Sequence, residues 1–479
     1  MFASFRDPAG RLLILDGRVI RVVKKSAEPD LRAALSSDAL KKFLAEGKLV
    51  HTDFLDEEAA RALAARGEVA GALDGGDEES LLVEHERIPF PSFPYEWTPE
   101  MLHAAGELTL DLAERLLPAG IGLKDATPYN VLFRGPRPVF IDLLSFERRD
   151  PADQTWLAYA QFARTFLLPL LVNKHFGIKL DQIFMPNRDG LDPEEVAPLV
   201  GRLQGVRPPF LTLVTLPARL SRRPAASDPS IYRKHTASSA EKAQFILGRV
   251  LKGLRRKLES VRPARARGSA WSDYMEQNRY TEDYLPLKEQ FVKAALDETK
   301  PRRVLDVGCN TGHFSELAAR AGASLVSIDY DPVVVGKTWA RAAAENLDIL
   351  PLVVNLARPT PSLGWRNLEN SSFLDRAVGS FDGVLMLAVI HHMLVSERIP
   401  LEEIMALAAR LTTDLLVVEY VAPEDPMFRR IARGRDHLHE FLTREYFERV
   451  STRFFEIVRS EQLGDTPRRI YMMRRRRVV

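Results

Sequence analysis

The stretch Arg303-Val-Leu-Asp-Val-Gly-Cys-Asn-Thr-Gly-His313 decides the fold of the C-terminal part of this chain. The largely apolar stretch 304–307 predicts a buried parallel strand, and a helix is expected to begin near Phe314. Between them, Gly308 and Gly312 allow the backbone to come within contact distance of a ligand, because neither carries a Cβ atom. The spacing G-x-x-x-G lacks the third glycine of dinucleotide-binding turns, so it favours a ligand without a pyrophosphate.

From residue 271 onward, strands and helices alternate as in a doubly wound parallel sheet. Asp329 ends the next predicted strand about 20 residues after the glycine turn, the spacing at which such sheets bind a ribose diol. Asn355 follows a further strand and carries an amide able to read an adenine edge. We expect several polar residues at the carboxyl edge of the sheet, where such folds bind ligands; they are Asp329, Asn355, His391, His392 and Glu419.

These residues together resemble class I S-adenosylmethionine-dependent methyltransferases. The resemblance rests on Asp306-Val-Gly-Cys-Asn-Thr-Gly312, on Asp329 and on the strand that begins Phe381-Asp382. It implies that Asp306, Gly308 and Gly312 flank the methionine moiety of the donor, that Asp329 binds the ribose and that Asn355 binds the adenine. The donor site implied as a whole comprises Asp306, Gly308, Cys309, Asn310, Gly312, Asp329 and Asn355. The stretch from Asn355 through Pro361–Trp365 to His391-His392 and Glu419-Tyr420 also resembles a bacterial subgroup related to host-specific nodulation proteins.

Three residues are candidates for the catalytic step. If the acceptor is a hydroxyl, a general base assists methyl transfer, and His391 or His392 is in position for that role. Glu419 is the third candidate. The alternative for each histidine is a role in capping a strand or packing in the core. The alternative for Glu419 is an ion pair with a basic residue such as Arg429 or Arg433. Cys309 is expected to be a small residue in a tight turn, not a nucleophile.

The N-terminal part carries a second motif. In Leu123-Lys-Asp-Ala-Thr-Pro-Tyr-Asn130, an aspartate is followed five residues later by an asparagine, and Asp142 ends a strand twelve residues beyond that. The layout resembles the catalytic and metal-binding loops of protein kinases and aminoglycoside phosphotransferases. The resemblance implies that Asp125 is the base, that Asn130 and Asp142 hold Mg²⁺, and that ATP is the phosphate donor.

The N-terminal motif departs from the kinase pattern in several places. Leu123-Lys124 stands where a histidine-led triplet is usual, and Leu143-Leu144 replaces Phe-Gly. No glycine-rich loop precedes the motif, and no lysine is clearly the phosphate clamp, although Lys24 and Lys25 close the first hairpin. The sequence therefore leaves two interpretations of this domain open. It is either an active phosphotransferase or a degenerate domain that positions the acceptor or mediates assembly.

Composition and charge limit the possible partners and the possible location of the protein. The 479 residues carry a formal net charge of +2, which gives no general preference for nucleic acid or membrane. The single cysteine and the absence of a signal peptide lead us to expect a cytoplasmic protein. The segment 243–259 predicts an amphipathic basic helix, whose basic face we expect in solvent rather than on a membrane surface or on RNA.

The sequence thus predicts an α/β protein of three parts. They are a kinase-like α+β domain at 1–235, a basic helix and linker at 236–270, and a Rossmann-like, doubly wound methyltransferase domain at 271–479. The predicted function is methyl transfer from S-adenosylmethionine to an unidentified acceptor, with a hydroxyl of a glycan or small molecule favoured. The alternatives are a bifunctional kinase-methyltransferase acting on a bacterial glycan and a non-catalytic scaffold that retains the donor-binding fold.

Overall fold

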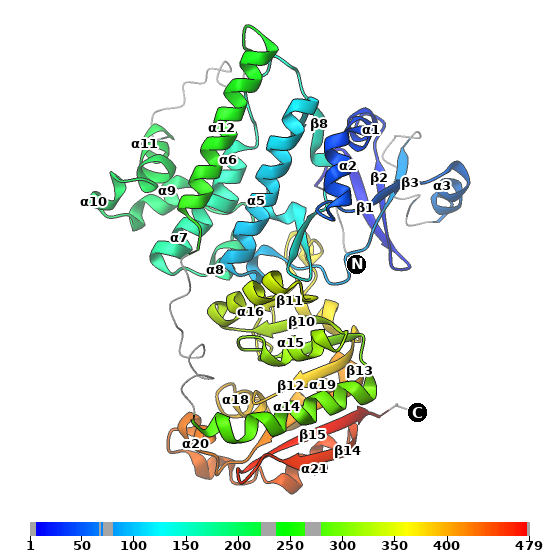
Figure 1. Cartoon of the computed structure of the whole chain (residues 1–479), viewed down its shortest axis with the longest axis vertical. Coiled ribbons are helices and arrows are strands. Elements are labelled where there is room, and N and C mark those ends of the chain that lie inside the picture. Colours follow the sequence, from blue (N-terminus) through cyan, green and yellow to red (C-terminus); the bar gives the residue numbers. More distant parts are fainter. Residues whose placement is uncertain (1–5, 67–68, 70–79, 222–235, 264–278, 477–479) are drawn as a thin grey trace. The chain divides into compact units, whose positions relative to one another are not determined.

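The computed structural model describes residues 6–66, 69, 80–221, 236–263 and 279–476 (Figure 1). The chain divides into two compact units. The N-terminal unit comprises 1–95, 99–264 and 363–370, and the C-terminal unit comprises 96–98, 265–362 and 371–479. Within the described ranges, no helix is both long enough and apolar enough to span a bilayer.

The C-terminal unit is built on a seven-stranded sheet of order β11-β10-β9-β12-β13-β15-β14. Its strands are β9 (Arg303–Val307), β10 (Ser324–Asp329), β11 (Ile349–Val353), β12 (Phe381–Met386), β13 (Thr412–Val421), β14 (Phe455–Gln462) and β15 (Arg468–Arg475). The first five are parallel, whereas β15 is antiparallel to both β13 and β14. The strand order reverses between β9 and β12, and open α/β sheets bind their ligands at such a point. The predicted doubly wound fold is confirmed.

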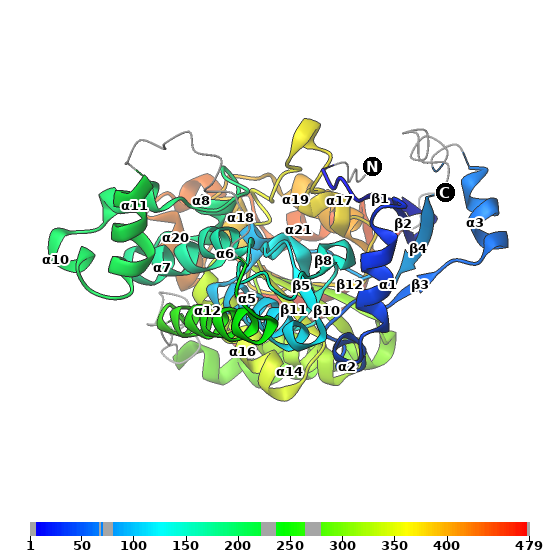
Figure 2. The ribbon, with the colours of Figure 1, turned by 90° about the horizontal axis from the view of Figure 1, so that it is seen from above.

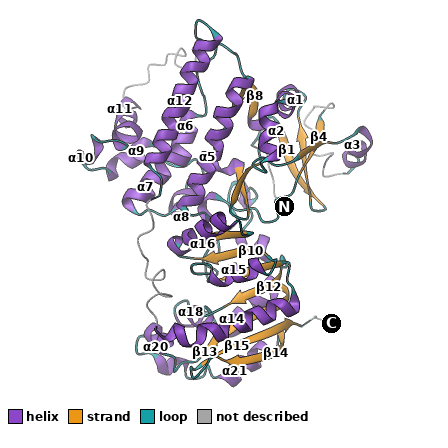
Figure 3. Ribbon diagram, in the orientation of Figure 1, coloured by secondary structure: helices purple, strands orange, loops and turns teal. Residues whose placement is uncertain are grey.

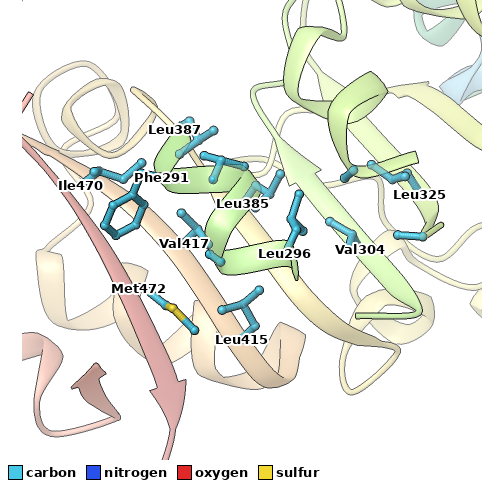
Figure 4. Packing of buried hydrophobic residues seen from close by; sticks show 14 of the residues in the cluster. Phe291, Leu296, Val304, Leu325, Leu385, Leu387, Leu415, Val417, Ile470 and Met472 are labelled. Atoms are coloured by element: carbon cyan, nitrogen blue, oxygen red, sulfur yellow. The ribbon is translucent and has the colours of Figure 1, made fainter. Parts of the chain in front are cut away.

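Helices cover this sheet. They are α14 (Arg279–Thr299), α15 (His313–Arg320), α16 (Pro332–Glu345), α17 (Phe373–Ala377), α18 (Ile390–Val395), α19 (Leu401–Leu411), α20 (Pro426–Ala432) and α21 (Arg444–Ser451). Phe291 and Leu296 of α14 pack against Leu385, Val417 and Met472 of the strands (Figure 4). Because side chains alternate along a strand, the residues between these sheet positions face the other side, where they are also buried. The sheet is therefore a central layer, which explains its nearly continuous apolar strands.

The N-terminal unit is α+β, as predicted (Figure 3). Its antiparallel sheet has the order β1-β2-β4-β3 and consists of β1 (Gly10–Leu15), β2 (Arg18–Val23), β3 (Thr52–Phe54) and β4 (Leu81–His85). Asp16 and Gly17 join the first two strands with φ of 50° and 80°, the two positive values that a type I′ turn requires. The helices described alongside the sheet are α1 (Glu28–Ser36), α2 (Asp38–Ala45) and α3 (Glu57–Ala64).

The second part of the N-terminal unit surrounds the buried helix α5 (Pro99–Leu116). Short strands flank the residues of the kinase-like motif, namely β5 (Ile121–Leu123), β6 (Val131–Arg134), β7 (Arg137–Phe140) and β8 (Phe146–Arg148). Short helices then follow, α6 (Tyr159–Phe162), α7 (Leu168–Phe176), α8 (Leu180–Phe184), α9 (Pro193–Val196), α10 (Arg202–Gly205) and α11 (Leu216–Ser221). In both Figure 1 and Figure 2, α10 and α11 lie at the outer edge of this unit.

The predicted basic helix is α12 (Ala240–Ser260), and it belongs to the N-terminal unit. Its apolar stripe is buried as expected, with Leu247, Leu251, Leu254 and Leu258 facing inward. The basic face is not wholly solvated, because Arg255 pairs with Asp111 and Glu114 of α5. The linker predicted after this helix falls largely on 264–270, which lies outside the described residues.

Candidate functional site

The glycine turn after β9 is held against the neighbouring strand. The backbone N–H groups of Gly308 and Cys309 both donate to the carbonyl of Ile328, at 2.8 and 3.0 Å. Gly308 and Gly312 have φ of 73° and 81°, a region that residues with a Cβ rarely adopt. The turn is therefore rigid and opens α15 at His313, close to the predicted start.

The reason for each glycine is more specific than ligand approach. A Cβ on Gly308 would lie 3.2 Å from Cγ2 of Val389, and one on Gly312 would lie 2.6 Å from Cγ2 of Thr338. The glycines thus permit close packing of the turn on α16 and on the loop after β12. This packing brings the loops that follow β9 and β12 together at the reversal of strand order.

The side chain of Asp329, at the end of β10, contacts the backbone of the glycine turn. One carboxylate oxygen accepts from the backbone N–H of Asn310 at 3.1 Å, and the other accepts from Asp331 at 3.1 Å. Burial raises the pKa of Asp329 to about 6, against the effect of these hydrogen bonds. A carboxylate in this position has lone pairs left for the two hydroxyls of a ribose.

Asn355 lies just past β11, and its side-chain oxygen accepts from the backbone N–H of Ala357 at 2.9 Å. That bond fixes the amide orientation. An adenine would therefore meet the donating NH₂ group, which suits an acceptor nitrogen of its ring.

Asp306 and Cys309 are both buried. The carboxylate of Asp306 accepts from the hydroxyl of Ser315 at 2.6 Å, and Ser315 in turn accepts from Ser327 at 2.8 Å. Burial raises the pKa of Asp306 to about 6 and raises that of the Cys309 thiol well above its usual range. Cys309 is therefore a protonated, packed thiol, as the sequence predicts.

His391 and His392 lie in the first turn of α18, directly after the loop that touches Gly308. Their ring centroids are 4.3 Å apart, and the ring of His391 stacks at 6.5 Å on Phe428. His391 is 2% exposed, and among the described residues neither of its ring nitrogens has a hydrogen-bond partner. Burial is the largest cause that lowers the pKa of both groups, to about 4 for His392, so both imidazoles are neutral at pH 7.

The predictions for Glu419 need correction. Glu419 does not end its strand, because β13 continues to Val421 and Glu419 pairs with Ile470 inside the sheet. The side chain has no exposed surface and forms ion pairs with Lys288 and Arg468, at 2.6 and 3.2 Å. The alternative of a structural ion pair with a basic residue is therefore present, but the partners are Lys288 and Arg468 and not the two arginines named as examples. A carboxylate held by two buried cations is not free to accept a proton from a substrate.

Sequence reasoning missed the two cations that hold Glu419. Lys288 comes from α14 and is 6% exposed, and Arg468 comes from β15, where it also pairs with Asp425 at 2.7 Å. The guanidinium of Arg468 also lies 5.4 Å from the ring centroid of Tyr284, which is itself buried. No local motif marks these residues, because segments far apart in the chain bring them together.

The three residues of the kinase-like motif interact with one another through hydrogen bonds or through charge. The amide of Asn130 donates to the hydroxyl of Ser145 at 3.0 Å, and that hydroxyl donates to Asp142 at 2.5 Å. Burial raises the pKa of Asp125, and the negative charge of Asp142 adds to the effect. Asn130 and Asp142 thus meet through Ser145, a residue that sequence reasoning did not single out.

Sequence reasoning also missed Arg21, which places a buried positive charge next to Asp142. Its guanidinium donates to Asp142 at 2.6 Å and to Asp7 at 2.6 Å, and its side chain is 8% exposed. Arg21 lies on β2, in the hairpin where Lys24 and Lys25 were considered as the clamp. Both oxygens of Asp142 therefore have partners from the chain itself.

Comparisons with known proteins agree with this architecture. A family model described as a methyltransferase domain matches residues 277–460. The chain is 29% identical to nodulation protein NoeA of Rhizobium meliloti over 98% of its own length and 95% of that protein. It is 26% identical to the O-antigen chain terminator bifunctional methyltransferase/kinase WbdD of Escherichia coli, over 40% of this chain and 25% of that one.

Among solved structures, the chain is similar to the N-methyltransferase NodS of Bradyrhizobium japonicum. The match has 16% identity and a TM-score of 0.30, and it covers 40% of this chain and 96% of that chain. The matched domain, the relatives and the sheet order agree on one conclusion: the chain is an S-adenosylmethionine-dependent methyltransferase with its methyltransferase domain in the C-terminal part.

Proposed function

We propose that the C-terminal unit transfers the methyl group of S-adenosylmethionine to a hydroxyl of a glycan or small molecule, at the carboxyl ends of β9 and β12. The observation that carries the proposal is that both ring nitrogens of the buried His391 lack a hydrogen-bond partner among the described residues. A buried imidazole with two unpaired nitrogens costs free energy unless another molecule satisfies it. Its position, two residues from the valine that touches Gly308, puts it beside the turn expected to hold the donor.

The residues at this edge fit the donor. Asp329 offers free lone pairs for the ribose diol, and the fixed amide of Asn355 offers donors for the adenine ring. We assign Asp306, Gly308, Cys309, Asn310 and Gly312 to the walls around the methionine moiety, with Asp306 acting from within the sheet. When bound, the donor supplies an electrophilic methyl group on a sulfonium.

The neutral histidines suit a hydroxyl acceptor. As the acceptor oxygen bonds to the methyl carbon and the carbon–sulfur bond breaks, the hydroxyl proton becomes strongly acidic. A base with a pKa of about 4, such as His392, is then strong enough to accept it, and before that step it accepts a hydrogen bond that orients the hydroxyl. The product is a methyl ether, and the proton resides on the imidazole until it exchanges with water.

The test is a donor-consumption assay with extracted glycans and small molecules as acceptors. Replacing His391 or His392 with glutamine is expected to lower kcat by about 10²–10³-fold while leaving donor affinity unchanged. His51→Gln offers a matched control, because His51 is exposed and belongs to the N-terminal unit. Unchanged kcat in both histidine variants, with an acceptor turned over by the parent chain, would exclude a base role for either residue.

For the N-terminal unit we propose a non-catalytic role that supports the methyltransferase. The similarity to WbdD keeps the bifunctional kinase-methyltransferase as the alternative. Against phosphotransfer, the residues do not fit Mg²⁺. Asp142 already binds the Arg21 guanidinium and the Ser145 hydroxyl, so a cation would have to displace a buried positive charge.

A further inference from the structure

The segment 196–227 has an unusual composition. It contains no aspartate or glutamate but five arginines, Arg202, Arg207, Arg219, Arg222 and Arg223, and it is rich in leucine and valine. Its own charge of +5 exceeds the +2 of the whole chain. Within its described part, to Ser221, no ion pair involves Arg202, Arg207 or Arg219, and all three are exposed.

The same segment exposes large aliphatic side chains. Leu203 is 80% exposed, Val206 61% and Leu220 59%, and Leu199 and Leu216 are almost half exposed. Elsewhere among the described residues, large hydrophobic side chains this exposed are scattered along the chain. Such a concentration on one surface marks an interaction site more often than a solvated face.

These exposed residues lie on one folded corner. The hydroxyl of Thr215, which precedes α11, donates to the carbonyl of Gly205 at the end of α10, at 2.7 Å. This bond ties the residues around Val206 to those around Leu216. The corner is anchored from inside by Phe210, which is 3% exposed and whose ring lies 4.8 Å from that of His175 on α7. The exposed leucines therefore project from a segment that is itself folded and packed.

We propose that this corner, residues 197–221, docks on the surface of an anionic phospholipid bilayer. Aliphatic side chains enter the acyl boundary, and arginines around them pair with lipid phosphates.

Two other occupants fit less well. A second copy of the chain joined by two-fold symmetry would bring the same three arginines toward one another, and residues 197–221 contain no acidic side chain to offset them, although Glu194 and Glu195 lie on the neighbouring α9. Single-stranded nucleic acid stacks on aromatic side chains, whereas the exposed apolar residues of this corner are aliphatic.

The test is co-sedimentation of the full chain with vesicles of phosphatidylcholine, alone or mixed with phosphatidylglycerol, at low and high salt. We expect binding to the mixed vesicles that is at least about tenfold weaker on the neutral ones and is reduced by salt. The double variant Leu203→Glu/Leu220→Glu should lose about tenfold or more of the partition coefficient. The control Leu157→Glu, at a residue 68% exposed elsewhere in the same unit, should bind like the parent.

A triple variant, Arg202→Gln/Arg207→Gln/Arg219→Gln, separates the two contributions. It should lose the preference for anionic vesicles and the salt dependence. Equal thermal unfolding of all variants shows that the fold is kept, as expected for exposed positions. Absence of binding to mixed vesicles, or equal binding by the double variant, overturns the proposal. A change in solution mass of the leucine variant with unchanged vesicle binding overturns it in favour of self-association.

Discussion

The ammonium of Lys288 lies 2.6 Å from the carboxylate of Glu419, a side chain with no exposed surface. Arg468 holds the other carboxylate oxygen and bridges to Asp425, so four charges form one buried network. The network joins α14, β13, β15 and the start of α20. It holds the helix that precedes the glycine turn against the middle of the sheet.

Glu419→Gln should therefore act on stability. Removing one partner leaves buried cations uncompensated, and we expect a loss of about 3–5 kcal/mol in the free energy of unfolding of this unit. Denaturant unfolding measures the loss. The control Glu397→Gln breaks the Arg358–Glu397 pair, in which Arg358 is exposed, and should cost less than about 1 kcal/mol. A Glu419 variant of normal stability with a collapsed kcat would restore the catalytic assignment.

Donor binding should depend on the ionisation of Asp329. Its pKa is raised to about 6, so the group is a carboxylate above that pH and a neutral acid below it. Because only the carboxylate accepts from both ribose hydroxyls, affinity for the donor should be constant above pH 7 and fall as the pH drops through about 6. Calorimetry across this range measures the dependence.

Asp329→Asn separates this effect from that of Asp306, whose pKa is also raised to about 6. The variant should weaken donor binding by about 1–3 kcal/mol at pH 7. The part of the pH dependence due to Asp329 should disappear with it. Asp348→Asn, on the exposed loop before β11, serves as the control. Equal affinity of the Asp329 variant and the parent at pH 7 would remove Asp329 from the donor site.

The glycine turn offers a matched pair of substitutions. Gly312 and Gly322 both have positive φ, 81° and 98°, but a Cβ would lie 2.6 Å from Thr338 at the first and has no neighbour within 4 Å at the second. Gly322→Ala should cost about 1–2 kcal/mol through backbone strain alone. Gly312→Ala should cost more and weaken donor binding, as unfolding and calorimetry would measure. Equal costs would show that the contact with Thr338 is easily relieved.

The N-terminal site should not bind nucleotide. With Asp142 paired to Arg21 and Ser145, the full chain is expected to show no magnesium-dependent ATP binding at millimolar concentration. Asp142→Asn should instead destabilise the N-terminal unit by about 3 kcal/mol, because Arg21 is buried. ATP binding that requires magnesium and disappears in this variant would support the bifunctional reading.

The sequence alone determined the C-terminal fold because its signals are local. A buried strand that runs into a glycine turn, and apolar strands that alternate with helices, require only neighbouring residues to be recognised. The doubly wound sheet, the start of α15 near Phe314 and the buried stripe of α12 were predicted on this basis and are present. The donor-site residues Asp306, Asp329 and Asn355 remain predictions that the geometry supports.

Tertiary structure decided what the charged residues do. Glu419 reads as a strand-end carboxylate, yet its environment is set by Lys288 and Arg468, which lie on α14 and β15 far away in sequence. Asp142 keeps the spacing of a metal ligand, yet Arg21, more than a hundred residues earlier, occupies it. A sequence motif determines the position of a side chain along its strand or turn. Its desolvation and its ion pairs depend on the distant segments that pack around it. These interactions determine whether a buried charge has a catalytic or a structural role.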